Sequence, residues 1–455
     1  MFVPLTPSVW RGVKGGGARW HMSDASNEKH VVIALCGSAK KKRQSFDKLQ
    51  RYLEEVGAGR SRSEGCGDVH FTFSFLEMHY DEAKNSFSTV TGEDADVVLH
   101  KVSTLPPGAV GALRRWCVVA SQGRRRRHLP PVILVDPVEK TRLVLRRSLT
   151  YKLLGSHLKR PFCQIPCSWL WARDEASLVP LGFVSLGLND EEVAGSPGTT
   201  QRLRERWWMA KPDLSTGPPF THHMVIWKGV QPKSDMPEEV RCLLPPSSNA
   251  FVVQEFLLYA LPVVIKVYCI GSRVFVKAVS TTPLLRRVLS GMGAPVFVDS
   301  QSKFLNEVGW EEQEACWRSY LAEGERAHTQ CSQIAEVLFQ ELGLTLFGFD
   351  LLLTPEHGPQ QGSTLPAALS TSQETTPHTI LLNTSLFDEV TGAPSELLCS
   401  ASPVLIDVNY FPGFAGVEDA AEHMLDAIKA KVLEASVTHV RPVLEKMGLD
   451  CHRCC

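Results

Sequence analysis

The sequence contains no uninterrupted apolar run of about twenty residues, the length that a membrane-spanning helix requires. It also contains no internal repeat. Its 13 cysteines stand mostly alone, without the paired spacing of a zinc site or a secreted disulfide framework, as at Cys36, Cys66, Cys117 and Cys242. The chain has 455 residues, 44% of them hydrophobic, so we expect two or three core-forming units in a reducing compartment, with function located in a cleft.

Net charge is also nearly absent, at −1, but the charges are unevenly distributed. Residues 1–160 hold 27 Lys and Arg against 15 Asp and Glu, whereas residues 161–455 hold 21 against 34. The basic N-terminal part and the acidic remainder of the chain indicate an anionic ligand together with a metal ion.

The sequence predicts little structure at either end of the chain. Residues 1–29 are expected to form a disordered extension, although the first 22 residues have three basic and no acidic side chains, which weakly resembles a targeting peptide. Residues 441–455 are expected to form a tail whose closing Cys451, Cys454 and Cys455 are reduced, with lipidation or metal binding as alternatives.

Residues 30–160 alternate between strand and helix patterns. A short apolar run at 30–35 is followed by a basic loop at 40–43 and by apolar residues at helical spacing from Phe46. A further strand ends at Asp136, and residues 139–154 are predicted to form one helix. This pattern is typical of an open α/β domain, which binds ligands beyond the carboxyl ends of its strands.

From residue 161 the pattern changes to short strands separated by proline-rich turns, which predicts antiparallel sheets. We assign residues 161–270 to a central lobe and residues 271–440 to a C-terminal lobe, with a helix at 327–342 leading into its last strands. Residues 354–402 are rich in Ser, Thr, Pro and Gln and are expected to form a surface insertion with little order.

Carboxylates in two apolar strands indicate a metal site. Asp407 and Asn409 are two residues apart in a strand, so their side chains point to the same face. Asp350 lies 57 residues upstream in a second apolar strand, where an unpaired buried carboxylate would be costly. Such a set of oxygen donors suits Mg²⁺.

Two lysines embedded in apolar strands, Lys211 and Lys266, could clamp a polyphosphate. The alternative is that both are surface lysines whose heads reach water. Between them, the backbone at the strand end 254–257 could bind an adenine edge, and the loop that ends in His222 could cover phosphates, although adjacent histidines in a loop are often merely exposed.

The order of these motifs resembles the inositol-tetrakisphosphate 1-kinases, also called inositol trisphosphate 5/6-kinases, a family of the ATP-grasp superfamily. The resemblance covers residues 30–353 and 403–435. Its most specific part is the closing sequence that contains Asp407, Asn409, Pro412, Gly413 and Gly416. Earlier motifs contain Lys40 to Arg43, His100 and Lys101, Asp136 with Arg142, Arg147 and Ser148, Lys211 to Met224, Gln254, and Lys266 with Gly271.

The resemblance implies an α/β ATP-grasp fold, with an N-terminal open α/β domain followed by two α+β lobes that sandwich ATP. It implies phosphoryl transfer from ATP to an inositol tris- or tetrakisphosphate, with two Mg²⁺ ions. The ATP site would comprise Arg142, Lys211, Gln254, Glu255, Phe256, Leu257 and Lys266. The metal ligands would be Asp350, Asp407 and Asn409, and the inositol phosphate site would comprise Lys41, Lys101, His222, Asn409 and Gly413.

Two departures from the family pattern affect the substrate side: Thr216 stands where relatives carry His or Asp, and a gap makes Lys277 a doubtful contact. No residue is assigned as a general base. The alternatives are an ATP-grasp carboxylate–amine ligase and a non-catalytic inositol phosphate sensor. A nucleic-acid role could be argued from the arginine run 124–127, but no aromatic-rich strand accompanies it, and we expect no nucleic-acid partner. We expect a cytoplasmic monomer, with a nuclear location also open.

Overall fold

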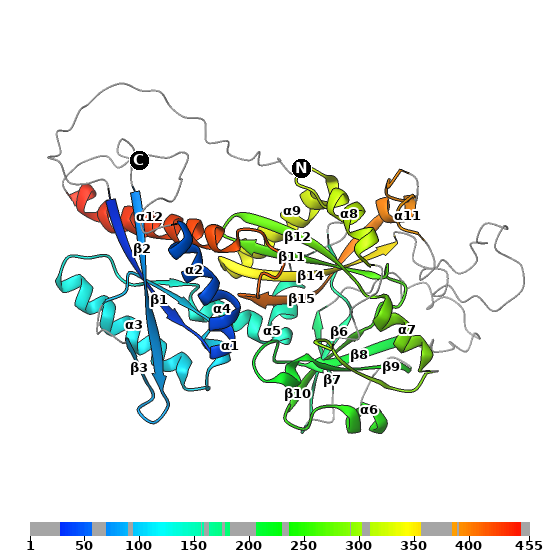
Figure 1. Cartoon of the computed structure of the whole chain (residues 1–455). Coiled ribbons are helices and arrows are strands. Elements are labelled where there is room, and N and C mark those ends of the chain that lie inside the picture. Colours follow the sequence, from blue (N-terminus) through cyan, green and yellow to red (C-terminus); the bar gives the residue numbers. More distant parts are fainter. Residues whose placement is uncertain are drawn as a thin grey trace, which may run out of the picture.

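The described part of the computed structural model forms three β-sheets (Figure 1). The predicted extension 1–29, except for its last two residues, and the C-terminal cysteines lie outside the described residues. The structure describes residues 28–56, 70–89, 94–155, 157–158, 163–174, 178–182, 206–229, 236–291, 293–302, 310–355, 385–388 and 391–446.

The N-terminal sheet has five strands in the order β3-β2-β1-β4-β5, and all neighbours are parallel except β2 and β3. Alternate residues of β1 enter different cores: Val31 and Ile33 pack with helix α2, whereas Ala34 packs with helix α3. The sheet is therefore buried on both faces, and the expected open α/β domain is confirmed. The elements are β1 (Glu28–Cys36), α2 (Asp47–Val56), β2 (His70–Asp81), β3 (Ser86–Thr89), β4 (Val97–His100), α3 (Ala109–Arg126) and β5 (Ile133–Val135).

The single helix predicted for 139–154 is wrong, because it is broken into α4 (Val138–Leu145) and α5 (Arg147–Leu154). Arg146 between them is extended, with φ −122° and ψ 118°, and bridges to Leu214 in an antiparallel manner. The Arg147 amide then donates to the Asp213 carbonyl at 2.8 Å instead of continuing the first helix. The break brings the start of α5 to the central lobe.

The central sheet has six strands in the order β13-β9-β8-β10-β6-β7, and its neighbours are antiparallel, as expected. A core of apolar side chains that includes Trp171, Trp208, Val225 and Phe251 packs on it. The strands are β6 (Ser168–Ala172), β7 (Leu178–Gly182), β8 (Arg206–Pro212), β9 (His223–Gly229), β10 (Ala250–Glu255) and β13 (Val296–Asp299).

The C-terminal sheet has four antiparallel strands in the order β12-β11-β14-β15, with α8 and α9 against β12 (Figure 1). The lobe boundary predicted at residue 270 is therefore wrong: β11 pairs with β12 and β14 in this sheet, and β13 returns to the central one. Helix 327–342 is confirmed. The elements are β11 (Val263–Ile270), β12 (Arg273–Ser280), α8 (Trp310–Tyr320), α9 (Arg326–Leu342), β14 (Leu346–Pro355) and β15 (Ala401–Tyr410).

Part of the predicted insertion 354–402 is ordered, since α11 and the start of β15 lie within it, whereas 356–384 lie outside the described residues. The last helix reaches Lys446, inside the predicted tail. No helix in the described part of the chain is long and apolar enough to cross a membrane. The remaining elements are α1 (Ala39–Lys41), η1 (Lys42–Phe46), η2 (Val102–Thr104), η4 (Pro219–His222), α6 (Glu238–Leu243), α7 (Thr282–Ser290), α11 (Glu396–Cys399) and α12 (Ala420–Lys446).

Candidate nucleotide and phosphate site

A cleft of about 750 Å³ lies where the three sheets meet. Each unit contributes to its wall: α1 and the end of β4 from the N-terminal domain, β8 to β10 from the central lobe, and β11, β14 and β15 from the C-terminal lobe. Every residue that the sequence nominated for a site lines this cleft, except Arg142.

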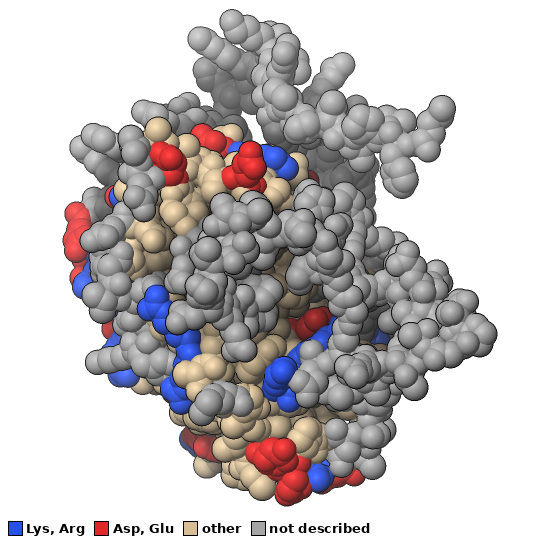
Figure 2. Space-filling view, turned by 90° about the vertical axis from the view of Figure 1, so that its right-hand side faces the viewer, with Lys and Arg blue, Asp and Glu red and all other residues tan. Residues whose placement is uncertain are grey.

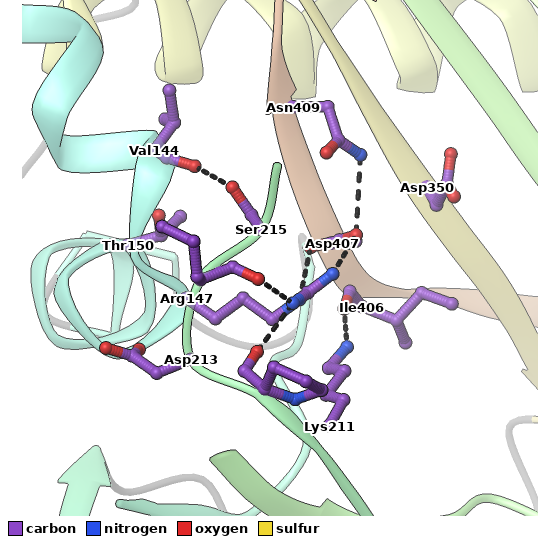
Figure 3. Close-up of polar contacts among 12 residues, drawn as sticks. Val144, Arg147, Thr150, Lys211, Asp213, Ser215, Asp350, Ile406, Asp407 and Asn409 are labelled. Carbon is purple, nitrogen blue, oxygen red and sulfur yellow. Dashed lines mark hydrogen bonds and ion pairs between the residues drawn. The ribbon is translucent and has the colours of Figure 1, made fainter. Parts of the chain in front are cut away.

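The two carboxylates of the predicted metal site face each other across a strand pair. Asp350 of β14 is the register partner of Asp407 of β15, and the register shifts immediately after them because Ile406 is an extra residue on β15. Asn409 Nδ2 donates to Asp407 Oδ2 at 3.3 Å. Figure 3 shows these three side chains at the same end of the two strands.

Each carboxylate has a basic partner. Arg147 Nε lies 3.3 Å from Asp407 Oδ1, and Lys266 Nζ lies 3.3 Å from Asp350 Oδ2. Burial raises the pKa of Asp350, and the neighbouring Asp407 adds to this. Burial also acts to raise the pKa of Asp407, but the charges of Arg147 and Lys211 outweigh it and lower that pKa overall. Asp407 is therefore held as a carboxylate.

The donor set fits Mg²⁺. Among the described residues no group of three or more His, Cys, Asp and Glu is arranged for a metal ion. Mg²⁺, however, usually binds through one or two carboxylates and completes its shell with water and substrate phosphates. Asp350, Asp407 and the Asn409 amide supply that number of protein ligands, and the mutual repulsion of two facing carboxylates favours a cation between them.

Lys211 contacts β15 beside Asp407. It is buried, and its Nζ donates to the Ile406 carbonyl at 2.8 Å (Figure 3). The same carbonyl accepts a hydrogen bond from the Tyr151 hydroxyl. The extra residue on β15 thus turns its carbonyl towards the cleft. Burial lowers the pKa of Lys211 to about 8, although Asp407 opposes the shift. An ammonium that is so poorly hydrated is a strong potential partner for a phosphate.

The strand end proposed for adenine binding lines the other side of the cleft. Gln254, Glu255 and Leu257 are buried, and Gln254 Oε1 accepts from the Tyr151 hydroxyl at 3.2 Å. Glu255 Oε2 is a buried acceptor without a hydrogen-bond partner among the described residues, although Oε1 lies 3.6 Å from Arg206. Phe256 and Leu257 add apolar side chains to this part of the cleft wall.

The lysines predicted to bind inositol phosphate lie on the N-terminal side and contact the turn after β15. Lys41 Nζ donates to the carbonyls of Phe411 and Pro412, both at 3.0 Å, and lies 3.5 Å from the centre of the Phe411 ring. Lys101 Nζ donates to the Tyr410 carbonyl. Burial lowers the pKa of Lys101 to about 7. Lys40, which the sequence did not nominate, is exposed and lines the cleft beside them.

His222 ends the loop that borders the cleft, and residues after β13 hold it. Its Nε2 lies 3.0 Å from Gln301 Nε2, and its carbonyl accepts from the Ser300 amide at 3.0 Å. Burial lowers the pKa of His222, and the charge of Arg147 adds to this. No signal in the sequence joined Gln301 to this loop, because the contact connects segments about eighty residues apart.

The prediction for Arg142 is not supported, because its side chain is exposed on α4 and does not line the cleft. Arg147 lines it instead: besides the Asp407 pair, its Nη1 donates to the carbonyls of Pro212 at 2.6 Å and Leu214 at 2.9 Å (Figure 3). Arg142 lies within α4, whereas Arg147 begins α5 beyond the extended Arg146 and lines the cleft.

The arginine run 124–127 lies at the end of α3 and not in a loop. Arg124 is buried, lies 2.6 Å from Asp96 and donates to the Pro130 carbonyl at 2.7 Å, and Arg127 pairs with Asp94. Two of the four arginines therefore make contacts within the N-terminal domain. On the face in Figure 2, the visible Lys and Arg side chains form small separate groups and not an extended basic surface.

No protein-family model matches the chain, and no curated protein matches its sequence. Solved structures with similar folds include the D-alanyl-alanine synthetase A from Vibrio cholerae O1 biovar eltor str. N16961, with 10% identity, TM-score 0.42, and 90% of this chain and 100% of that chain covered. The VanG D-Ala:D-Ser ligase from Enterococcus faecalis has 12% identity and TM-score 0.41, with 89% and 99% covered.

A Chryseobacterium gregarium RiPP-associated ATP-grasp ligase, in complex with ADP and a leader and core peptide, has 12% identity and TM-score 0.37, with 89% of this chain and 97% of that chain covered. Similarity at these values assigns no activity to the chain. The expected fold class, mixed α/β with an open N-terminal domain and two further lobes around a cleft, is confirmed by the sheets themselves.

Proposed function

We propose that this chain is an ATP-dependent kinase that transfers the γ-phosphoryl group to a ring hydroxyl of a soluble inositol tris- or tetrakisphosphate, as a monomer. One observation carries the proposal: a single cleft joins a carboxylate pair with Lys211 and Lys266 at one end to a group of basic side chains from a separate domain at the other. The first arrangement suits a metal-bound nucleotide, and the second suits a polyanionic acceptor.

At the nucleotide end, the backbone of the segment from Gln254 to Leu257 would hold the adenine ring. Lys211 and Lys266 would contact the phosphates. Their present partners, the Ile406 carbonyl and Asp350, keep both ammonium groups inside the cleft before a phosphate arrives. Holding charged groups in this way reduces the reorganisation that binding requires.

At the acceptor end, Lys40, Lys41, Lys101 and His222 line the wall, and Gly413 leaves open space beside them. An inositol polyphosphate carries many negative charges, so several hydrogen-bond donors, the lysine ammonium groups among them, must converge to offset the cost of desolvating it. A peptide-like acceptor would need few of these charges.

In the reaction, the bond between the γ-phosphorus and its bridging oxygen breaks, and that oxygen leaves with ADP. A bond forms from the γ-phosphorus to the acceptor oxygen, and the hydroxyl proton is released. Mg²⁺, held by Asp350, Asp407 and Asn409, would neutralise phosphate charge. Lys211 and Lys266 would stabilise the negative charge on the transferred group, and the basic wall would align the acceptor hydroxyl. No residue is required as a general base in this scheme, and we assign none.

The second candidate is an ATP-grasp carboxylate–amine ligase, which would use the same nucleotide end but form an acyl phosphate. The VanG and Chryseobacterium structures described above are named as ligases, so inositol phosphates and amino acids both belong in the test as acceptors. The third candidate, a non-catalytic sensor, would bind inositol phosphates without turnover.

The test incubates the purified wild-type chain and Asp407→Ala with Mg²⁺, labelled ATP and a panel of inositol phosphates or amino acids, and resolves products by anion-exchange chromatography. We expect a labelled product of higher charge from an inositol phosphate with the wild type only. Phosphate release driven by amino acids would support the ligase. Tight inositol phosphate binding without turnover, unchanged in Asp407→Ala, would support the sensor.

A further inference from the structure

Tyr410 connects the strand that carries the metal site to the N-terminal domain. Its side chain is 2% exposed, and its hydroxyl lies 2.9 Å from the His100 carbonyl and 3.1 Å from the Val135 carbonyl. The same oxygen accepts from the Asp136 amide at 3.1 Å. One phenol therefore contacts the carboxyl ends of both β4 and β5, where an open α/β domain presents its ligands.

The neighbours of Tyr410 along the chain belong to both halves of the site. Asn409 precedes it and donates to Asp407, whereas Phe411 and Pro412 follow it and accept from Lys41. The Tyr410 carbonyl itself accepts from Lys101. The Tyr410 side chain thus fixes the end of β15, where the strand with Asp407 and Asn409 leads into the turn that lines the acceptor end of the cleft.

The second metal strand is held by the same group of residues. The carboxylate of Asp136, which is 1% exposed, accepts from the amides of Thr345 at 2.7 Å and Leu346 at 3.0 Å. Leu346 begins β14, four residues before Asp350, and its carbonyl accepts from the Phe411 amide at 2.8 Å. Both metal strands are therefore fixed to the N-terminal domain at Asp136 and Tyr410.

We propose that the Tyr410 hydroxyl is a positioning residue that fixes the acceptor-binding domain relative to Asp350 and Asp407, so that an acceptor hydroxyl and not water receives the phosphoryl group. This role rests on the proposed function. The hydroxyl bonds to backbone groups of the N-terminal domain, and we assign it no contact with either substrate. Tyr410 acts by setting the distance between the N-terminal domain and the strands that carry Asp350 and Asp407. A displacement of the acceptor by about 1 Å can lower the rate a hundredfold.

Loss of the hydroxyl has a specific consequence. In Tyr410→Phe, the Asp136 amide loses its acceptor and the His100 and Val135 carbonyls lose the one proton that they share, while the ring keeps its packing against His100 and Phe411. The nucleotide end is attached through other residues and remains in place. The γ-phosphorus–oxygen bond can then break with water supplying the new oxygen, which yields ADP and inorganic phosphate.

The test compares the wild type, Tyr410→Phe and the control Tyr320→Phe, whose hydroxyl donates to the Leu398 carbonyl outside the cleft. The readouts are the kcat of transfer, the KM of ATP, the ADP formed per phosphorylated inositol phosphate, and hydrogen exchange of the Asp136 amide. For Tyr410→Phe we expect transfer to fall by about tenfold to a hundredfold, an unchanged KM for ATP, more ADP than product, and faster exchange. Tyr320→Phe should match the wild type in all four.

A one-to-one ratio of ADP to product with wild-type kcat in Tyr410→Phe would overturn the proposal, as would unchanged exchange at Asp136. If the wild type phosphorylates no acceptor in the panel, the proposed function fails, and so does the role of Tyr410 in directing transfer to an acceptor. If the Asp136 amide then still exchanges faster in Tyr410→Phe, only the attachment of β15 to the N-terminal domain by Tyr410 would be supported.

Discussion

Arg147 and Asp407 form an ion pair of 3.3 Å that joins the N-terminal end of α5 to the metal strand β15. Both side chains are largely buried, at 7% and 18% exposed, so each would be costly without the other. Because Arg147 also donates to the carbonyls of Pro212 and Leu214, one guanidinium connects the central lobe to the carboxylate that would hold Mg²⁺.

The first prediction is that Arg147→Lys lowers kcat/KM for ATP by about a hundredfold or more. A lysine keeps the charge but cannot bond to Asp407 and to two carbonyls at the same time. Steady-state kinetics with ATP as the varied substrate would measure the effect.

The matched control is Arg142→Lys, five residues away on α4. Its side chain is exposed and outside the cleft, so the kinetic constants should stay within about twofold of the wild type. Equal losses in both variants, or a larger loss in Arg142→Lys, would contradict the assignment of the site to Arg147.

The second prediction concerns Gly413. A Cβ atom built at this position meets no protein atom within 4 Å, so Gly413→Ala should keep the Tm of the wild type. The added methyl group would instead occupy space beside the acceptor wall. We expect the KM of the inositol phosphate to rise by about tenfold while the KM of ATP stays constant.

Gly123→Ala is the control for the glycine substitution, because Gly123 on α3 also has no atom within 4 Å of an added Cβ and lies far from the cleft lining. In a helix this change should stabilise the fold by about 0.5–1 kcal/mol without affecting either KM. An unchanged acceptor KM in Gly413→Ala would mean that the acceptor does not approach this turn.

Local patterns of the sequence predicted those parts of the fold that depend on neighbours in the chain. Strand alternation identified Asp407 and Asn409 as side chains of one face, and the structure brings both into the cleft with Asp350. Helix periodicity likewise predicted α9. These features follow from geometry within a single strand or helix.

The errors arose where tertiary contacts overrode local pattern. Residues 139–154 have helical periodicity throughout, but the bridge between Arg146 and Leu214 breaks the helix, and Arg147 at the start of α5 lines the cleft. The lobe boundary failed for a similar reason, because the pairing of β11 with β14 connects segments about eighty residues apart. Hydrogen bonds between distant segments leave no periodic signal.

The third prediction concerns the contact of His222 with Gln301. The Gln301 amide nitrogen donates to His222 Nε2, which places the imidazole proton on Nδ1, and burial keeps the ring neutral. In Gln301→Glu a carboxylate would instead accept from Nε2 and favour the imidazolium, raising the pKa of His222. Nitrogen-15 NMR of the histidine rings would follow the titration.

Gln301→Met keeps the size of the side chain without its polar group and serves as the control. Here the pKa of His222 should not rise. If Gln301→Glu and Gln301→Met titrate alike, the side chain at position 301 does not control the protonation of His222.

The fourth prediction is that His100 makes the fold sensitive to acid. Its ring is fully buried, its Nε2 donates to the Asp136 carbonyl at 2.6 Å, and its Nδ1 has no partner among the described residues. Burial lowers the pKa of His100 from 6.5 to about 4. The unfolded chain therefore binds a proton as the pH falls below about 6.5, whereas the folded chain stays neutral until about pH 4.

The stability contributed by the neutral ring is thus complete above about pH 6.5 and is lost as the pH falls towards 4, by at most about 3 kcal/mol. His100→Gln retains a donor for the Asp136 carbonyl but cannot be protonated. Urea unfolding at pH 7.5, 6, 5 and 4.5 should show the wild type losing its advantage over His100→Gln step by step. A constant difference between the two proteins across this range would mean that the folded state protonates His100 as readily as the unfolded chain does.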